Sequence, residues 1–502
     1  MTTAPHTPPH LVARVAVDGS LPHLDRPFDY LVPDSEAAEV AVGVRVRVRF
    51  AGKLRDGYVL GLGDHSDAGE KLRPLERVIS PEVVLTEPVA HLCRAVADHY
   101  GGTLADVLRM AVPGRHAATE AALWVEYPEP RTPGPATVLP EYPGGRAFLD
   151  AVADGLHLRA AWTPVPVHGG PGDWAAGLVE AAAASLAGGR GALLIVPDAD
   201  ALAALAGRCA DAFGAGSFVS LTADLGPAAR YRAFLAASRG LVPLVLGTRN
   251  AGYAPVADLG LIAVWDEGND SLSEPRAPYP HAREVAALRA SQEHCALLIA
   301  GRARTAETQA LVERGWLAPL EMPPASNRRL GPVVRIAADS DLALERDPAA
   351  RAARLPHDVF AAIRTGLASG PVLLQVPRAG YVSAVSCEAC REPARCPRCA
   401  RVMRGERASG PLQLVCGSCG PLAGTWRCPS CGGGALRGPR VGVRRTAEEL
   451  GKAFPQTRVI ESWSGHLVDA VGDEPALVLA TPGAEPAASG GYSAAILLDT
   501  WL

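Results

Sequence analysis

The chain has 502 residues, of which 48% are hydrophobic and 20% charged, so it is long enough for about three folded domains and too apolar to be disordered. Its formal net charge of −4 excludes a general attraction of the whole chain to nucleic acid or to an anionic membrane. DNA binding would therefore have to come from local basic surfaces. No apolar run reaches the ~18 residues of a membrane span, and the first residues do not resemble a signal peptide. We expect a cytoplasmic protein with no membrane partner.

The first part of the chain is predicted to be rich in β-structure. Residues 44–50, VRVRVRF, alternate apolar and basic side chains, as in a strand with one buried face. The valines should face a core, and the arginines should point outward. These arginines suit DNA phosphates; alternatively, they are charges at a solvated edge that block strand pairing. The outward residues are Arg45, Arg47 and Arg49.

The rest of the chain predicts an α/β fold. Residues 87–110 have helical periodicity, and residues 128–143 are rich in proline, as in a linker. Apolar runs then alternate with helical stretches, which is typical of a parallel, doubly wound sheet. A second unit of this kind begins near Val333. The chain stops at Leu502 directly on an apolar strand, so we expect this second unit to be incomplete.

Eleven cysteines are unevenly distributed along the chain. Three of them, Cys93, Cys209 and Cys295, stand alone in apolar segments and are expected to be buried core residues. The other eight form four C-x-x-C pairs between residues 387 and 431. Two such pairs complete a tetrahedral thiolate site that suits zinc and leaves no open position for catalysis, so we predict two structural Zn²⁺ ions. A disulfide framework is the alternative, and it would require an oxidising compartment.

The spacing of the pairs indicates how they share the metals. Sixteen residues separate the second pair from the third, which is the interval of a zinc ribbon, whereas only five separate the first from the second. We predict a nested arrangement, with a crossed pairing as the alternative. The first zinc would take Cys387, Cys390, Cys428 and Cys431, and the second Cys396, Cys399, Cys416 and Cys419. Nine arginines and three glutamates over residues 387–440 mark a surface for DNA or a partner or, equally, a solvated face.

Residues 165–177, VPVHGGPGDWAAG, have the order of a phosphate-binding loop. A short apolar strand, a glycine-rich turn and a helix are predicted in succession. The lysine that such a loop requires is missing, and Asp173 would repel a triphosphate. None of the three lysines of the chain stands in a suitable context elsewhere.

Several segments together resemble one known family. FDYLVP at residues 28–33 lies in the β-rich part, GTRNAGYAP at 247–255 and LGLIAVWDEGND at 259–270 lie in the first α/β part, and the eight-cysteine insert interrupts the second. Over nearly the whole chain this combination resembles the primosomal replication-restart family PriA of superfamily 2 DNA helicases. The resemblance implies a β-rich DNA-binding domain, two RecA-like parallel α/β lobes and a double zinc module inserted in the second lobe. The nested cysteine pairing is also that of the family.

The resemblance also implies domains. Residues 1–115 would form a domain that captures the 3′ end of a nascent strand, and residues 116–143 would form a linker without a helix-turn-helix. A degenerate first helicase lobe would span residues 144–330. A second lobe would span residues 331–502, with the zinc insert at 386–434.

The family's end-binding pocket and motor motifs can be located in this sequence. The pocket uses the FDY triplet and a basic residue, and the matching residues are Phe28, Asp29, Tyr30 and Arg73. The family's phosphate loop, G-x-x-G-x-G-K-T, has lost its Lys and Thr here, and GRART at residues 301–305 replaces the coupling motif. We therefore expect no catalytic residue and a doubtful ATP/Mg²⁺ site. The relic positions are Gly169 and Gly172 in the loop and the carboxylates Asp266 and Glu267, which would hold Mg²⁺ and orient water.

The leading hypothesis is a replication-restart protein without helicase activity of its own. It would bind branched DNA at stalled forks and promote loading of the replicative helicase. Its expected partners are fork DNA with a nascent 3′ end, the replicative helicase or its loader, and single-stranded DNA-binding protein, in the cytoplasm at the nucleoid. The alternative is an active ATP-dependent 3′→5′ DNA helicase with a non-standard nucleotide site. A zinc-ribbon protein acting on RNA is a third possibility, against which FDYLVP argues.

Overall fold

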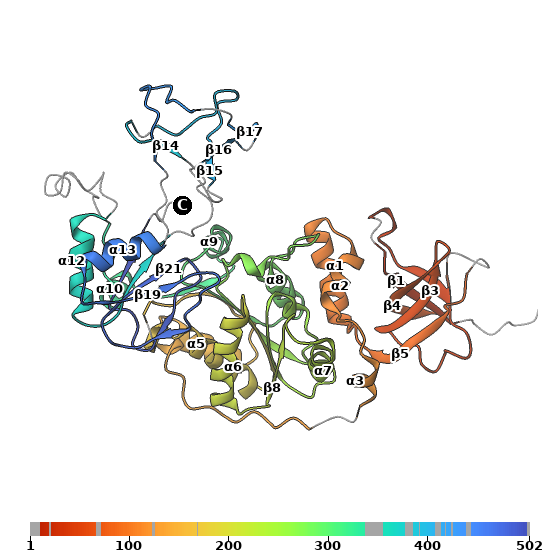
Figure 1. Cartoon of the computed structure of the whole chain (residues 1–502). Helices are drawn as coiled ribbons and strands as arrows, with labels where there is room; N and C mark the ends of the chain where they lie inside the picture. The colour runs from red at the N-terminus through yellow and green to blue at the C-terminus, as the bar shows by residue number, and fades with distance from the viewer. Residues whose placement is uncertain are drawn as a thin grey trace, which may run out of the picture. The chain divides into compact units, whose positions relative to one another are not determined.

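The structure is a computed structural model that separates into two compact units, Met1–Val333 and Val334–Leu502 (Figure 1). Among the described residues no helix has the length and apolarity needed to cross a membrane. The described residues are 11–19, 22–66, 72–122, 126–167, 169–336, 355–376, 385–390, 392–406, 413–416, 418–422, 425–437 and 443–498.

The first unit begins with a five-stranded antiparallel sheet. The predicted alternation in residues 44–50 is confirmed, because Val44, Val46 and Val48 are fully buried on the core side. The strand that they form lies between two others, so the hypothesis that its arginines protect a sheet edge is wrong. The strand order is β2-β1-β4-β3-β5, with β1 at Val12–Val17, β2 at Phe28–Leu31, β3 at Val44–Phe50, β4 at Lys53–Gly63 and β5 at Arg77–Val83.

The predicted helical segment at residues 87–110 forms two helices, α1 (Glu87–Tyr100) and α2 (Leu104–Ala111). The break occurs at Gly101, which adopts a left-handed conformation (φ 63°) that favours glycine. Both helices share one hydrophobic core with the α/β sheet that follows. A short helix, α3 (Ala117–Ala121), comes next.

The predicted Pro-rich linker is held against the first α/β lobe by hydrogen bonds. The Arg131 amide donates to the Phe213 carbonyl at 2.8 Å. The Glu180 carboxylate accepts from the amides of Val138 and Leu139, also at 2.8 Å. Within residues 126–137 the backbone forms no helix or strand, and Figure 1 shows this segment as an extended orange trace.

The first α/β lobe contains a seven-stranded parallel sheet with a core on each face, which confirms the doubly wound prediction. Alternate residues of one strand face opposite cores, as Leu193 and Leu194 do. The strand order is β12-β6-β11-β10-β7-β9-β8, with β6 at Arg159–Thr163, β7 at Gly191–Ile195, β8 at Phe218–Leu221, β9 at Leu244–Gly247, β10 at Leu259–Trp265, β11 at Ala296–Ala300 and β12 at Ala318–Glu321. The helices are α4 (Gly145–Ala153), α5 (Trp174–Ala187), α6 (Ala199–Phe213), α7 (Pro227–Ser238), α8 (Ala282–Gln292), α9 (Ala306–Glu313) and α10 (Pro324–Leu330).

One predicted strand of this lobe is wrong. Residues 165–167 lie after β6, which ends at Thr163, and they form an irregular segment leading into the glycine-rich turn. The three lone cysteines are buried as predicted. Burial raises the pKa of the Cys209 and Cys295 thiols to about 12, which keeps them protonated and inert.

The second unit contains a four-stranded parallel sheet that the cysteine insert interrupts, as predicted. The order is β19-β21-β13-β23, with β13 at Val372–Gln375, β19 at Arg458–Ser462, β21 at Ala476–Ala480 and β23 at Ala494–Leu497; α12 (His357–Leu367) and α13 (Val443–Ala453) accompany it. The insert contributes the short strands β14 (Ser386–Cys387), β15 (Arg404–Glu406), β16 (Gln413–Cys416), β17 (Gly420–Pro421) and β18 (Leu436–Arg437). The last residues, 499–502, lie outside the described residues, and the incompleteness of this unit stays a prediction.

Candidate nucleic-acid interface and metal centres

The predicted end-binding residues lie on both faces of the N-terminal sheet. Strand β2 pairs with β1 so that Asp29 is opposite Arg14 and Tyr30 is opposite Ala13. Side chains alternate along a strand, so Asp29 and Arg14 point away from the core and Phe28 and Tyr30 point toward it. We call the side that carries Asp29 and Arg14 the outer face.

Asp29 is the accessible polar group of the triplet. Its Oδ2 accepts a hydrogen bond from the Ser66 hydroxyl at 2.6 Å, and its Oδ1 lies 4.0 Å from the Arg14 guanidinium. The side chain keeps 24% of its surface exposed. A carboxylate held in this way can still accept a hydrogen bond from an incoming hydroxyl group.

The two aromatic rings of the triplet differ in exposure. Tyr30 is buried in the sheet core, and burial raises the pKa of its hydroxyl against the opposing effect of the nearby Arg73. Phe28 is half-buried: its ring meets Phe50 edge to face at 4.7 Å, and the Arg26 guanidinium lies 5.2 Å from its centre. Phe28 is therefore the ring of the triplet with surface available to a base.

The three outward arginines of β3 already have partners within the protein. Arg45 donates to the Pro113 carbonyl at 2.9 Å. The guanidinium of Arg47 lies 2.7 Å from the Asp56 carboxylate, and that of Arg49 lies 2.9 Å from Glu76. Exposed pairs of this kind contribute at most about 1 kcal/mol, so a DNA phosphate can compete for the guanidinium groups. Their role in DNA binding stays a prediction.

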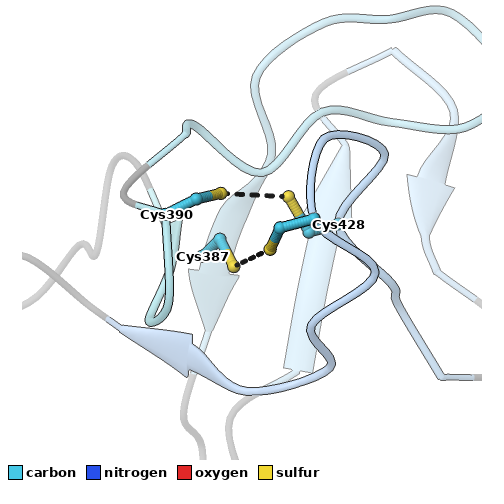
Figure 2. A group of neighbouring side chains, drawn as sticks. Cys387, Cys390 and Cys428 are labelled. Atoms are coloured by element: carbon cyan, nitrogen blue, oxygen red, sulfur yellow. Dashed lines mark hydrogen bonds between the residues drawn. The ribbon is translucent and has the colours of Figure 1, made fainter.

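The eight cysteines of the insert gather in the two nested sets that the spacing predicts. In each set the four sulfur atoms lie within 4.8 Å of one another. The sets are Cys387, Cys390, Cys428 and Cys431, and Cys396, Cys399, Cys416 and Cys419. Figure 2 shows three thiols of the first set pointing toward one another.

The distances between the thiols fit a metal centre better than a disulfide. The Cys387 and Cys431 sulfurs are 3.5 Å apart, and those of Cys390 and Cys428 are 3.4 Å apart. A disulfide requires about 2.05 Å, whereas tetrahedral coordination at about 2.3 Å per bond separates the sulfurs by about 3.8 Å. All eleven cysteines, which lie within the described residues, are free, so the disulfide framework is not what forms.

The C-x-x-C turns favour the thiolate, the form that binds metal, at some of these cysteines, whereas a hydrogen bond with the Cys399 sulfur raises the pKa of the Cys419 thiol to about 12. The amides of Ser418 and Cys419 donate to the Cys416 sulfur and lower the pKa of its thiol to about 6. The Cys390 amide likewise lowers the pKa of the Cys387 thiol. The insert therefore presents two four-thiol sites that could each hold a metal ion.

The glycine-rich turn of the first lobe satisfies its own backbone. Within it, the amides of Gly172 and Asp173 donate to the carbonyls of Gly169 and Gly170 at 3.0 Å. A phosphate site at a helix N-terminus needs free amides that converge on the anion. These two amides are engaged, and His168 at the start of the turn lies outside the described residues.

Side chains also form hydrogen bonds with the backbone of the segment before the turn. The Tyr142 hydroxyl accepts from the Val165 amide at 2.9 Å and donates to the Pro171 carbonyl. Arg302 donates to the Val165 carbonyl at 2.7 Å. The amide and carbonyl of Val165 and the carbonyl of Pro171 are therefore engaged within the protein.

Asp173 has a structural role at the start of α5. Its carboxylate accepts from the Ala176 amide at 3.1 Å, which caps the helix, and it is ion-paired with Arg208. Placing the family's loop pattern from Gly169 onward puts Ala175 and Ala176 at its Lys and Thr positions. Neither alanine can contact a phosphate or a magnesium ion through its side chain.

Two tryptophans stack where the turn approaches the end of β10. The rings of Trp174 and Trp265 are nearly parallel, with an interplanar angle of 8° and centres 4.7 Å apart. The Arg302 guanidinium lies 5.6 Å from the Trp265 ring. Trp265 is the residue directly before Asp266, so this stack lies beside the predicted Mg²⁺ position.

The second relic carboxylate, Glu267, is 1% exposed and fully engaged. It is 2.7 Å from the buried guanidinium of Arg283, and it accepts from the amide and hydroxyl of Thr305 at 2.7 and 2.9 Å. Asp266 accepts from the Asn269 side chain at 2.8 Å. Glu267 therefore holds α8 and α9 to the sheet and is not free to orient water.

Comparison with known proteins identifies the family. Residues 14–113 match the family model of the PriA 3′DNA-binding domain (3′BD). The chain is 50% identical over 488 residues to the "Probable replication restart protein PriA" of Mycobacterium tuberculosis H37Rv, which covers 96% of this chain and 73% of the relative. The Mycobacterium leprae relative of the same name is 48% identical over 496 residues. The Bacillus subtilis "Replication restart protein PriA" is 29% identical over 279 residues, which cover 55% of this chain and 34% of the relative.

The chain belongs to the PriA family of replication restart proteins. The matched domain contains the outer face with Asp29, so a PriA-type end-binding domain and this accessible carboxylate coincide. The domain boundaries given above stay predictions.

In this member of the PriA family, sequence reasoning missed the residues that fill the relic nucleotide site. They are Tyr142, Trp174, Trp265, Arg283 and Arg302. One signal was available: a tryptophan follows Asp173 directly, and another precedes Asp266 directly. The partners of Glu267 and Val165 come from distant segments and left no local pattern.

Proposed function

We propose that this protein restarts replication by recognising branched DNA at stalled forks without acting as a helicase itself. Its N-terminal domain would capture the 3′ end of the nascent strand, and the fold as a whole would help to load the replicative helicase, directly or through its loader. Single-stranded DNA-binding protein is a further expected partner, and the cytoplasm at the nucleoid is the expected location. The observation that carries the proposal is the match of residues 14–113 to a 3′DNA-binding domain whose Asp29 carboxylate is partly exposed.

End capture predicts a preference for a 3′-hydroxyl over a 3′-phosphate. Asp29 would accept a hydrogen bond from the terminal hydroxyl, whereas a terminal phosphate would place a second anion beside it. A hydrogen bond to a charged group contributes about 1.5–3 kcal/mol, so a fork with a 3′-hydroxyl should bind at least about tenfold more tightly. Fluorescence anisotropy with the full chain at fixed salt measures both affinities.

Asp29→Ala should abolish this preference. Glu76→Ala is the matched control, because it also removes a carboxylate that is paired with an outer-face arginine and should leave the preference intact. Equal affinity of the unaltered protein for the two forks would refute end capture through Asp29.

The absence of a motor is supported by the closed turn, the stacked tryptophans and the engaged Glu267. Phosphoryl transfer depends almost entirely on positioning and charge stabilisation by Lys, Mg²⁺ and Arg, so we expect no DNA-stimulated ATP hydrolysis and no strand separation. Release of phosphate from Mg-ATP, with and without fork DNA, is the measurement. The control is Asp266→Asn, which removes a carboxylate predicted to hold Mg²⁺. Turnover above this control would identify the protein as a helicase with an unusual nucleotide site.

The insert is proposed to bind two Zn²⁺ ions through its eight thiolates. The described geometry supports four-coordinate sites without an open position, so the metals would have a structural role. By holding the two ribbon-like halves of the insert together, the metal ions would shape a basic module that binds DNA or a partner protein.

A further inference from the structure

A cavity lies on the N-terminal domain, apart from the FDY triplet. Its volume is about 190 Å³, and it lies between the outer face of the sheet and helix α2. Strands β3 and β4 supply Arg45, Asp56 and Tyr58, and α2 supplies Leu108 and Arg109. With Asp18, which also lines it, the cavity thus has an aromatic ring, two guanidinium groups and two carboxylates in its wall.

The register of the strands places this cavity on the same face as Asp29. Asp29 is opposite Arg14 on β1, and the next outward residue of β1, Ala16, is opposite Tyr58 on β4. Tyr58 in turn is opposite Arg45 on β3. Two strand spacings of about 4.8 Å sideways and two residues of about 3.4 Å along the strand separate Asp29 from Tyr58, or roughly 12 Å.

The groups in the wall suit a nucleobase. The Tyr58 ring is half-buried, with the Arg45 guanidinium 5.4 Å from its centre, and both are surfaces on which a base can stack. Arg109 lies 3.6 Å from Asp18, which also lines the cavity, so hydrogen-bond donors and acceptors stand side by side. The edge of a base carries both donors and acceptors, whereas an isolated phosphate would be repelled by Asp18 and Asp56.

We propose that this cavity, which we call the Tyr58 pocket, binds a base of the nascent strand two to four nucleotides before the 3′ end that Asp29 holds. This inference rests on the end capture proposed above. The stacked repeat of DNA is 3.4 Å per nucleotide, and an extended strand reaches roughly twice that, so about 12 Å corresponds to about two extended steps or three to four stacked steps, that is, to the third, fourth or fifth base from the end. The outward Arg14 lies on the same face, on the strand between those of Asp29 and Tyr58, where it can contact an intervening phosphate.

The test is an abasic scan of the nascent strand in a fork with a 3′-hydroxyl, bound to the full chain. Loss of one base among the third, fourth and fifth positions should weaken binding at least about fivefold, and loss at the sixth or seventh position should not. Tyr58→Leu keeps an apolar side chain but removes the ring. It should weaken binding of the intact fork by the same factor, and its affinity should no longer depend on which base is missing. Tyr58→Phe should retain the unaltered pattern.

The 3′-hydroxyl preference separates the two proposals. If Tyr58→Leu keeps the 3′-hydroxyl preference, its domain is folded and its end capture is intact. A flat abasic scan in the unaltered protein would then refute the Tyr58 pocket alone. Absence of the preference in the unaltered protein would refute end capture instead. Deoxyguanosine monophosphate is the probe for a free nucleotide: if Tyr58→Leu abolishes its binding while the scan is flat, the pocket serves free nucleotides and its assignment to the nascent strand is wrong.

Discussion

Removing metal with a chelator is expected to unfold the cysteine insert and to leave the first α/β lobe folded. Four of the nine residues in the core of the insert are cysteines, so little apolar surface remains to stabilise it without metal. Structural zinc sites contribute about 10–16 kcal/mol of apparent binding energy at neutral pH, which is folding energy for such a module. Elemental analysis should give two zinc ions per chain, and hydrogen exchange should show loss of protection confined to the insert.

Two cysteine variants provide the matched comparison. Cys396→Ser removes one ligand of the second set and should release that zinc ion. Cys209→Ser replaces a buried cysteine far from either set in sequence and should keep both ions. One zinc ion or none in the unaltered protein, with the thiols oxidised in pairs, would contradict the assignment.

Glu267→Ala is expected to destabilise the first lobe by about 3–5 kcal/mol. The substitution leaves the Arg283 guanidinium, which is 7% exposed, without its closest carboxylate, and it removes the acceptor for Thr305 at the start of α9. Removing one partner of a buried ion pair has a cost of this size because the remaining charge stays out of water. Urea unfolding followed by tryptophan fluorescence should report an earlier transition for the lobe that contains Trp174 and Trp265.

Glu307→Ala is the matched control for this prediction. Glu307 lies 3.9 Å from the same guanidinium, but its side chain is 65% exposed, so its removal should change stability by less than about 1 kcal/mol. Replacing both buried partners, by Glu267→Leu with Arg283→Met, should recover much of the loss. If Glu267→Ala were no more destabilising than Glu307→Ala, the retained carboxylate would not be structural, and a role in nucleotide chemistry would regain support.

The local periodicity of apolar residues and the spacing of the cysteines determined much of this protein's fold. The alternation in VRVRVRF predicted which side chains of β3 face the core, because successive side chains of a strand point to opposite faces. Apolar runs separated by helical stretches predicted the parallel sheets. The four C-x-x-C pairs predicted the nested sets of thiols, since each short turn holds its two sulfurs together and the intervals limit which turns can meet.

Only the tertiary structure decided how distant segments meet. Residue spacing along one strand does not say that β3 lies inside its sheet, that Tyr30 is buried while Asp29 is partly exposed, or that α2 leaves a cavity over Tyr58. Nor does it show that Trp174 stacks on Trp265 or that Arg283 reaches Glu267. The physical reason is that these contacts follow from long-range packing, in which side chains far apart in sequence compete for one close-packed space.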